Sequence, residues 1–158
     1  MYQKGDKIVY PLYGAGIIEG LEHKDIDGTM HTYYALDIPV ANLKIHISAT
    51  KADDLGVRPI MPKDEVLVAL HASIGTCVNM PDNWNIRCKE NMERMKTGAI
   101  TQVAIVFHSL LIRERERGLS TVEKKMMTTA KQIILSELIL SMDIERTEAD
   151  EILDNIFL

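Results

Sequence analysis

The spacing of apolar residues changes abruptly near residue 60, and this change constrains the fold more than any other feature of the sequence. Up to about Ser48 the apolar residues come in short or alternating runs, which is the period of β-strands. After the boundary they recur every three or four residues, which is the period of helices. Pro59 and Pro62 mark the boundary, because proline interrupts both kinds of element. The sequence therefore predicts an α+β protein with two domains, residues 1–60 and 61–158.

The first domain is expected to form a small curled sheet or barrel of four short strands. The segments with strand character are KIVYP, GIIEGLEH, MHTYYALDIP and NLKIHIS. Asp27-Gly28 predicts a tight hairpin turn, and Ala41-Asn42 predicts a second one. Gly14 and Gly16 are expected to flank a tight bend. The last strand alternates apolar side chains that face inward with polar ones that face solvent. The inward set is Leu43, Ile45 and Ile47, and the outward set is Lys44, His46 and Ser48.

The second domain is expected to be entirely helical, because start and stop signals divide it into five helices. The expected helices begin at Lys63, at Pro81-Asp82-Asn83, at Ile100, at Ser120 and at Thr147, and the first four end near Ser73, Gly98, Arg117 and Met142. Ser120 stands three residues before Glu123, which is the spacing of a capping box and the clearest of these signals. Thr147 and Asp150 repeat the arrangement at the start of the last helix.

The charge of the chain is unevenly distributed. The formal net charge is −5, yet residues 81–140 carry 10 basic and 7 acidic side chains, a local surplus of three positive charges. Only this block is attractive to phosphate. A surplus this small predicts weak affinity for DNA unless a partner holds the protein close to it.

The sequence contains no arrangement that is typical of an enzyme or a metal site. A catalytic centre needs a nucleophile with a base, a carboxylate pair in a pocket, or a metal cluster, and none of these patterns is present. The two cysteines, Cys77 and Cys88, have no zinc-site spacing. The histidines are scattered: His23, His31, His46, His71 and His108. We therefore expect neither catalysis, nor a metal, nor another cofactor.

The apolar stretches of the chain are far shorter than the roughly 20 residues that cross a bilayer, and the first ten residues lack the apolar core of a signal peptide. We therefore expect a reduced cytoplasmic protein that does not enter a membrane.

Trp84 is the single tryptophan and lies in the first turn of an expected helix, with Arg87 and Lys89 close behind it. One interpretation is that the ring inserts as a wedge at an unstacked base step while the cations hold phosphates. The other is that Trp84 heads a buried apolar row. That row would contain Trp84, Cys88, Met92 and Met95. From the spacing alone, burial is the favoured interpretation.

A second basic group surrounds Gly118, where two expected helices meet. It comprises Arg113, Arg115, Arg117, Lys124 and Lys125, interrupted by two glutamates. The group suits contact with duplex DNA, but it also suits an ordinary solvated helix end whose cations complement the helix dipole.

Several segments in the same order resemble the CarD/CdnL family of bacterial transcription regulators, over nearly the whole chain. They are GDKIVYPLYGAGIIEGLE, LGVRPI, PDNWNIRCKENMERMKTG and ERGLSTVEKKMMTTAKQIILSEL. In that family the N-terminal domain is similar to the Tudor-like domain of transcription-repair coupling factor that binds RNA polymerase. The resemblance implies a small Tudor or SH3-like barrel followed by a helical DNA-binding domain.

The resemblance also implies a function. Residues 1–60 would bind the RNA polymerase β subunit, with Lys24, Lys44 and His46 at the contact. The helical domain would hold promoter duplex DNA at the upstream edge of the melted bubble and stabilise the open complex. Carried over by position, Trp84 would be a minor-groove wedge, which favours exposure over burial.

On the same basis Arg87, Lys89 and Lys124 would contact phosphates, with Lys125 beside them. The protein is expected to act as a monomer that reaches the bacterial nucleoid through polymerase. The alternative is a protein-only adaptor, in which the helical domain docks a second protein and Trp84 anchors that interface.

Overall fold

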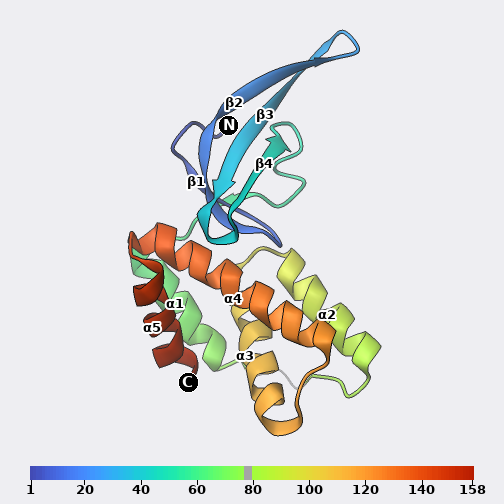
Figure 1. Cartoon of the computed structure of the whole chain (residues 1–158), viewed down its shortest axis with the longest axis vertical. Helices are drawn as coiled ribbons and strands as arrows, with labels where there is room; N and C mark the ends of the chain where they lie inside the picture. The colour runs from blue at the N-terminus through green and yellow to red at the C-terminus, as the bar shows by residue number, and fades with distance from the viewer. Residues whose placement is uncertain (77–79) are drawn as a thin grey trace.

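The computed structural model describes residues 1–76 and 80–158, so Cys77 lies outside the described residues. The chain builds a β-sheet half and then a helical half (Figure 1). The strands are β1 (Lys7–Tyr10), β2 (Gly14–Ile26), β3 (Thr29–Ile38), β4 (Leu43–Ser48) and β5 (Arg58–Pro59), with a short 3-10 helix, η1 (Pro39–Ala41), before β4. The helices are α1 (Lys63–Ile74), α2 (Trp84–Lys96), α3 (Ile100–Arg117), α4 (Thr121–Met142) and α5 (Arg146–Phe157). The predicted α+β fold class is confirmed.

The sheet is antiparallel, and its strand order in the described part of the chain is β4-β3-β2-β1-β5. The strands curl around a small core, and β2 and β3 continue beyond it as a long two-stranded arm (Figure 1). On β3 the side chains alternate between the core and the outer face. The core comprises Ile8, Ile18, Tyr34, Leu36, Ile38, Ile47, Ala52 and Val57. β5 adds a fifth strand to the four that the sequence predicts.

The predicted turn at Asp27-Gly28 is confirmed at the tip of the arm. Both residues have positive φ, 52° and 80°, as a two-residue hairpin of type I′ requires. At Ala41-Asn42 the chain instead forms η1, after which Asn42 adopts the left-handed conformation with φ 49°.

The predicted bend between Gly14 and Gly16 is wrong in position. The chain reverses direction at residues 11–13, between β1 and β2, where the Tyr13 N–H donates to the Tyr10 carbonyl at 3.0 Å. Gly16 lies inside β2, at a position where a Cβ would be 2.5 Å from the Asp37 carbonyl oxygen. This glycine permits close approach of two strands.

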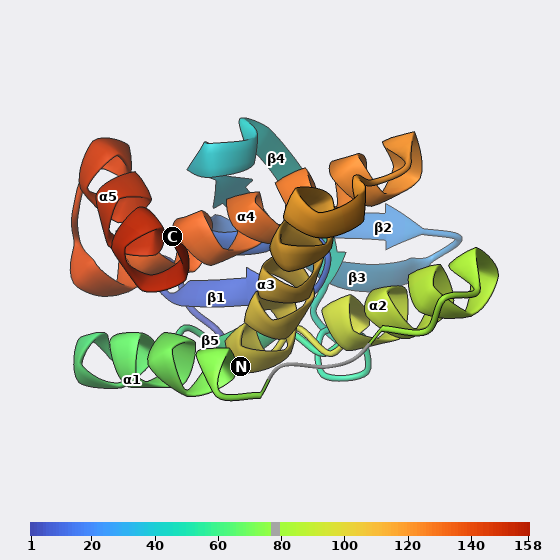
Figure 2. The ribbon, with the colours of Figure 1, turned by 90° about the horizontal axis from the view of Figure 1, so that it is seen from below.

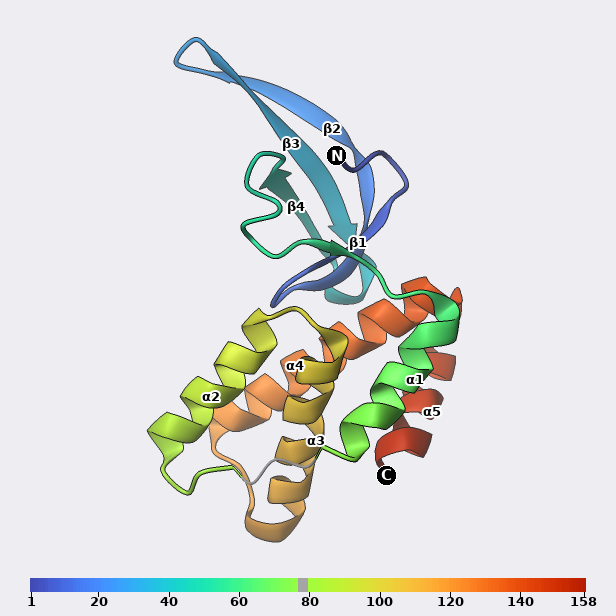
Figure 3. The same cartoon turned by 180° about the vertical axis from the view of Figure 1, so that it is seen from behind.

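The helical half packs around α3 and α4. Figures 2 and 3 show α3 between α1 and α2, with α4 behind it and α5 beside α1. The centre of its core comprises Val66, Leu70, Met95, Val103, Ala104, Leu110, Ile134, Leu135, Leu138 and Leu153. α5 contributes Ala149, Leu153 and Phe157, which share one face because they are four residues apart.

Two helix starts differ in how well the sequence predicted them. The capping box of Ser120 and Glu123 is present at the start of α4, with both reciprocal hydrogen bonds. The predicted cap at Thr147 and Asp150 is wrong. α5 begins at Arg146, directly after Glu145, and has no side-chain cap.

The two halves are joined by hydrogen bonds between the sheet and the C-terminal part of α4. The Ala15 N–H donates to the Ser136 Oγ at 2.8 Å, and the Lys7 Nζ donates to the Leu140 carbonyl at 3.0 Å. The carboxylate of Glu137 accepts two bonds from the guanidinium of Arg58. β4 is an outer strand of the sheet, and α2 and α4 begin at the end of the helical half that lies away from the sheet (Figure 1).

Candidate functional site

Trp84 is the first residue of α2, and 42% of its surface is exposed. The Asn83 side chain caps this helix by accepting a hydrogen bond from the Ile86 N–H at 3.1 Å. The indole N–H of Trp84 donates to the Ser120 Oγ, at the start of α4, at 3.0 Å. The N-termini of α2 and α4 therefore lie side by side.

The burial of Trp84 that its spacing favoured is wrong. Of the expected apolar row, Met95 is fully buried, whereas Cys88 and Met92 are only half-buried. The face of α2 that packs inward at its N-terminal end instead contains Arg87 and Asn91, each 4% exposed. With 3.6 residues per turn, Trp84 lies on the same side of α2 as Arg87 and Asn91, so its exposure comes from its place at the very start of the helix.

Arg87 forms a buried ion pair with Glu123 of α4. Its Nε and Nη2 donate to the two carboxylate oxygens at 2.8 and 3.0 Å. Its Nη1 donates to the carbonyls of Pro81 and Asp82 at 3.1 and 2.9 Å. The hydrogen bond with Glu123 raises the pKa of Arg87, and the same bond lowers the pKa of Glu123. Contact between this guanidinium and a phosphate would require these bonds to open.

Glu123 also belongs to the capping box of α4. The Ser120 Oγ donates to Glu123 Oε1 at 3.0 Å and accepts from the Glu123 N–H at 3.2 Å. A continuous set of hydrogen bonds thus runs from Arg87 through Glu123 and Ser120 to the ring of Trp84. The sequence predicted the capping box, but it gave no sign that Ser120 and Glu123 contact residues of α2.

The other predicted DNA contacts, Lys89, Lys124 and Lys125, are exposed within the first two turns of α2 and α4. Among the described residues, no ion pair involves these three lysines. Arg117, at the end of α3, donates to Asp82 at 3.0 Å. The predicted wedge and the three lysines therefore all lie within the first two turns of α2 and α4, and Arg87 is buried between these two helices.

The structure also brings together the three residues predicted to contact polymerase. The Lys24 Nζ lies 3.5 Å from the His46 Nδ1 and 5.3 Å from the ring centre of Tyr33. The His46 Nε2 lies 3.0 Å from the Glu22 carboxylate. Lys44 precedes His46 by two residues on the same face of β4 and pairs with Glu19 at 3.3 Å.

β4 also presents backbone groups at the edge of the sheet. Its ladder with β3 includes a bond of 2.9 Å from the Ala49 N–H to the Thr32 carbonyl. Because bonding alternates along an antiparallel pair, the N–H and C=O groups of Lys44 and His46 point away from β3. A second strand could pair with β4 there.

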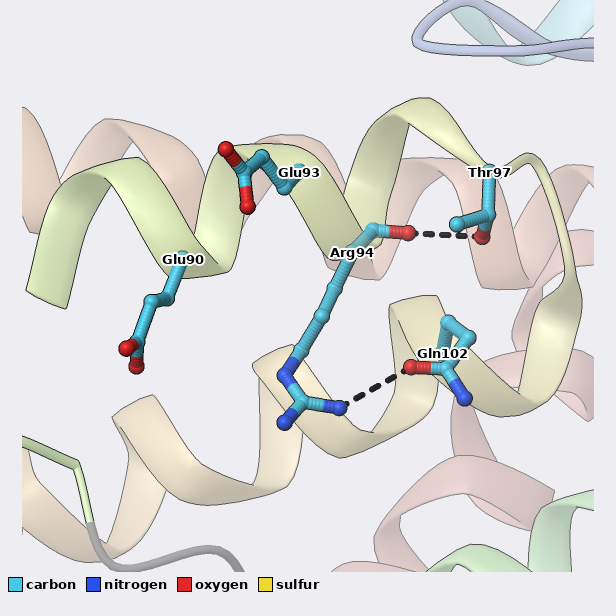
Figure 4. Close-up of a pocket in the computed structure, with 5 residues that line it drawn as sticks. All are labelled: Glu90, Glu93, Arg94, Thr97 and Gln102. Carbon is cyan, nitrogen blue, oxygen red and sulfur yellow. Dashed lines mark hydrogen bonds between the residues drawn. The ribbon is translucent and has the colours of Figure 1, made fainter.

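A hollow lies between α2 and the start of α3. The hollow in Figure 4 is lined by Glu90, Glu93, Arg94, Thr97 and Gln102. Arg94 reaches across it to the Gln102 side chain at 3.0 Å, and Glu93 points away from that guanidinium (Figure 4).

In residues 1–76 and 80–158, no group of three or more His, Cys, Asp or Glu side chains is placed to hold a metal ion. No helix in these ranges is long and apolar enough to span a bilayer.

Two family models together match most of the chain. The model "CarD-like/TRCF RID domain" matches residues 2–61, and the model "CarD, C-terminal domain" matches residues 65–154. A Bacillus subtilis (strain 168) protein described as "Putative transcription factor YdeB" is 33% identical over 141 residues, which covers 87% of this chain and 90% of that protein. These matches agree with the order of strands and helices in the structure, and the chain belongs to the CarD family of transcription regulators.

Proposed function

We propose that this transcription regulator binds the RNA polymerase β subunit through residues 1–60 and promoter DNA through residues 61–158, and thereby prolongs the life of the open complex. The exposed indole of Trp84, held at the N-termini of two helices whose first two turns carry exposed lysines, is the observation that carries the proposal. The match of residues 2–61 to a domain model shared with transcription-repair coupling factor supports the polymerase contact.

For polymerase we propose that β4 adds to a sheet of the β subunit. Its outward N–H and C=O groups at Lys44 and His46 supply main-chain hydrogen bonds, which give affinity. The side chains of Lys44 and His46 on β4 and of Lys24 on β2 lie on the outer face of the sheet and give specificity. The neighbouring glutamates would limit the strength of the contact, because they already pair with two of these groups.

For DNA we propose that Trp84 enters the minor groove at the upstream edge of the bubble. A large apolar side chain that inserts between base pairs stabilises an unstacked step. The helix N-termini on either side present N–H groups and partial positive charge to phosphates. Lys89, Lys124 and Lys125 add charged contacts around the same point.

Weak DNA contact is sufficient once polymerase holds the protein at the promoter, because the second contact is then effectively intramolecular. Stabilising the open complex by about 1.4 kcal/mol shifts its population roughly tenfold. One wedge and two or three phosphate contacts supply free energy of this order. The hydrogen bonds between the sheet and α4 keep the two binding surfaces at a defined separation.

The test is the lifetime of open complexes formed by polymerase on promoter DNA, measured after addition of a competitor, with wild-type protein and with Trp84→Ala. The variant should lose the prolonged lifetime while it still captures the β subunit. Because the ring is partly exposed, truncation should lower the free energy of unfolding by no more than about 1 kcal/mol. Val68→Ala removes a 67% exposed apolar side chain from α1 and is the matched control.

An undiminished lifetime with a stable, polymerase-bound Trp84→Ala variant contradicts the proposal. If that variant instead loses binding to a second protein, the helical half is an adaptor that docks protein through the same tryptophan.

A further inference from the structure

The indole N–H of Trp84 has a protein partner although much of the ring is exposed. Its bond of 3.0 Å to the Ser120 Oγ joins residues that are 36 positions apart in the sequence. Tryptophan can donate one hydrogen bond and accept none through this nitrogen, so the bond fixes the direction of the ring edge. A side chain whose only task was to insert its apolar face would not need such a bond.

The Ser120 hydroxyl is itself held in place. It has one proton to donate and two lone pairs to accept with. The proton goes to Glu123 Oε1, one lone pair accepts the Glu123 N–H, and the other faces the indole. All three capacities of the hydroxyl are used, which leaves it a single orientation.

The far end of this network is buried. Glu123 is 1% exposed and Arg87 is 4% exposed, and they share two hydrogen bonds of 2.8 and 3.0 Å. Short, charge-assisted pairs of this kind are geometrically well defined. The orientation of an exposed ring is thereby connected, through one serine, to a buried and immobile pair.

We propose that Ser120 is a positioning residue that holds Trp84 ready for insertion into DNA before DNA is bound. This inference rests on the proposed function. Ordering a flexible side chain during binding weakens affinity, and a side chain that is already ordered avoids that loss. The serine thus has two tasks, since it caps α4 and also orients the wedge of α2.

The two tasks can be separated by substitution. Glycine is nearly as good as serine at a helix N-cap, so Ser120→Gly removes the indole's partner at little cost to α4. Ser120→Thr keeps a hydroxyl at the same position and is the matched control. Trp84→Phe removes the N–H donor but keeps an apolar ring.

Fluorescence reports on the ring directly, because Trp84 is the only tryptophan in the chain. In the free protein, Ser120→Gly should lower the fluorescence anisotropy of Trp84 and increase its quenching by acrylamide, while Ser120→Thr should behave as wild type. If Ser120 served only to cap α4, its loss would not change the mobility of the Trp84 ring, and neither fluorescence signal would change. If Ser120→Gly leaves both signals unchanged, the ring is held by other contacts and the inference is wrong.

With polymerase and promoter DNA, Ser120→Gly should shorten the open-complex lifetime by a factor of about 2 to 10, the range expected when one side chain must be ordered on binding. In the Trp84→Phe background the same change should have no further effect. A full lifetime with Ser120→Gly, where Trp84→Ala shortens it, overturns the positioning role alone. If Trp84→Ala has no effect either, the proposed function and this inference both fail, whatever the fluorescence shows.

Discussion

Arg58 of β5 and Glu137 of α4 meet through two hydrogen bonds of 2.8 and 2.6 Å, which join the sheet to the helices. The same carboxylate accepts the Met61 N–H at 2.8 Å, and the guanidinium also donates to the Gly98 carbonyl at 3.1 and 2.9 Å. Glu137 is only 1% exposed. One buried carboxylate therefore organises the chain on both sides of the change from strands to helices.

We expect Glu137→Gln to lower the free energy of unfolding by about 3 kcal/mol, because the partly buried guanidinium of Arg58 loses its counter-charge. Urea unfolding measures this difference. Glu151→Gln, at an exposed position of α5, is the matched control and should change the value by less than about 0.5 kcal/mol. Equal effects of the two substitutions would mean that Glu137 contributes no more to the free energy of unfolding than an exposed carboxylate does.

Local patterns in the sequence predicted most of the secondary structure. The change of apolar period placed the transition from strands to helices, and Asp27-Gly28 and the box at Ser120 predicted a turn and a helix start that the structure contains. These signals succeed because the interactions behind them lie within a few residues of one another. The short strand β5 was missed, since a pair of residues has no period.

Long-range pairings were beyond such patterns, and the candidate site depends on them. The spacing of Trp84, Cys88 and Met95 fits an apolar row, but at the N-terminal end of α2 the buried position is taken by Arg87, which pairs with Glu123. Nothing near Arg87 in the sequence indicates a partner 36 residues away. The false cap at Thr147 has a similar cause, because α5 starts where its apolar face meets the core rather than where a capping pattern occurs.

If β4 pairs with a strand of polymerase, a proline at position 46 should abolish binding without unfolding the sheet. The His46 N–H points to the free edge, where proline is tolerated but cannot donate a hydrogen bond. His46→Ala removes the imidazole and keeps the N–H, so it separates the contribution of the side chain from that of the backbone. Capture of the β subunit measures both. Wild-type binding by a folded His46→Pro variant would exclude pairing at this edge.

The salt dependence of DNA binding should reveal how many of the exposed lysines contact phosphates. Each phosphate neutralised contributes about −0.9 to the slope of log affinity against log salt, so Lys89, Lys124 and Lys125 predict a slope of about −3. Lys89→Ala should make the slope shallower by about 0.9. A slope steeper than about −5 for the protein alone would contradict the weak, tethered contact proposed here.

The ion pair beneath the wedge should make stability depend on pH in a predictable direction. The hydrogen bond from Arg87 lowers the pKa of Glu123 below its ordinary value of 4.5. A carboxyl group whose pKa is lower in the folded state binds fewer protons there than in the unfolded state. Its stabilising contribution is therefore fully present above about pH 4.5 and is lost as the pH falls through the folded-state pKa.

Glu123→Gln removes this contribution at every pH. At pH 7 it should lower the free energy of unfolding by about 3 to 5 kcal/mol, because Arg87 stays buried without a counter-charge. As the pH falls below the ordinary glutamate range, wild-type Glu123 gains a proton and comes to resemble glutamine, so the two unfolding curves should converge. Glu116→Gln, at an exposed position near the end of α3, should show no such convergence. Urea unfolding of the three proteins between pH 7 and acid pH measures the effect, and a constant difference between wild type and Glu123→Gln over that range would show that the carboxylate charge is not what holds α2 against α4.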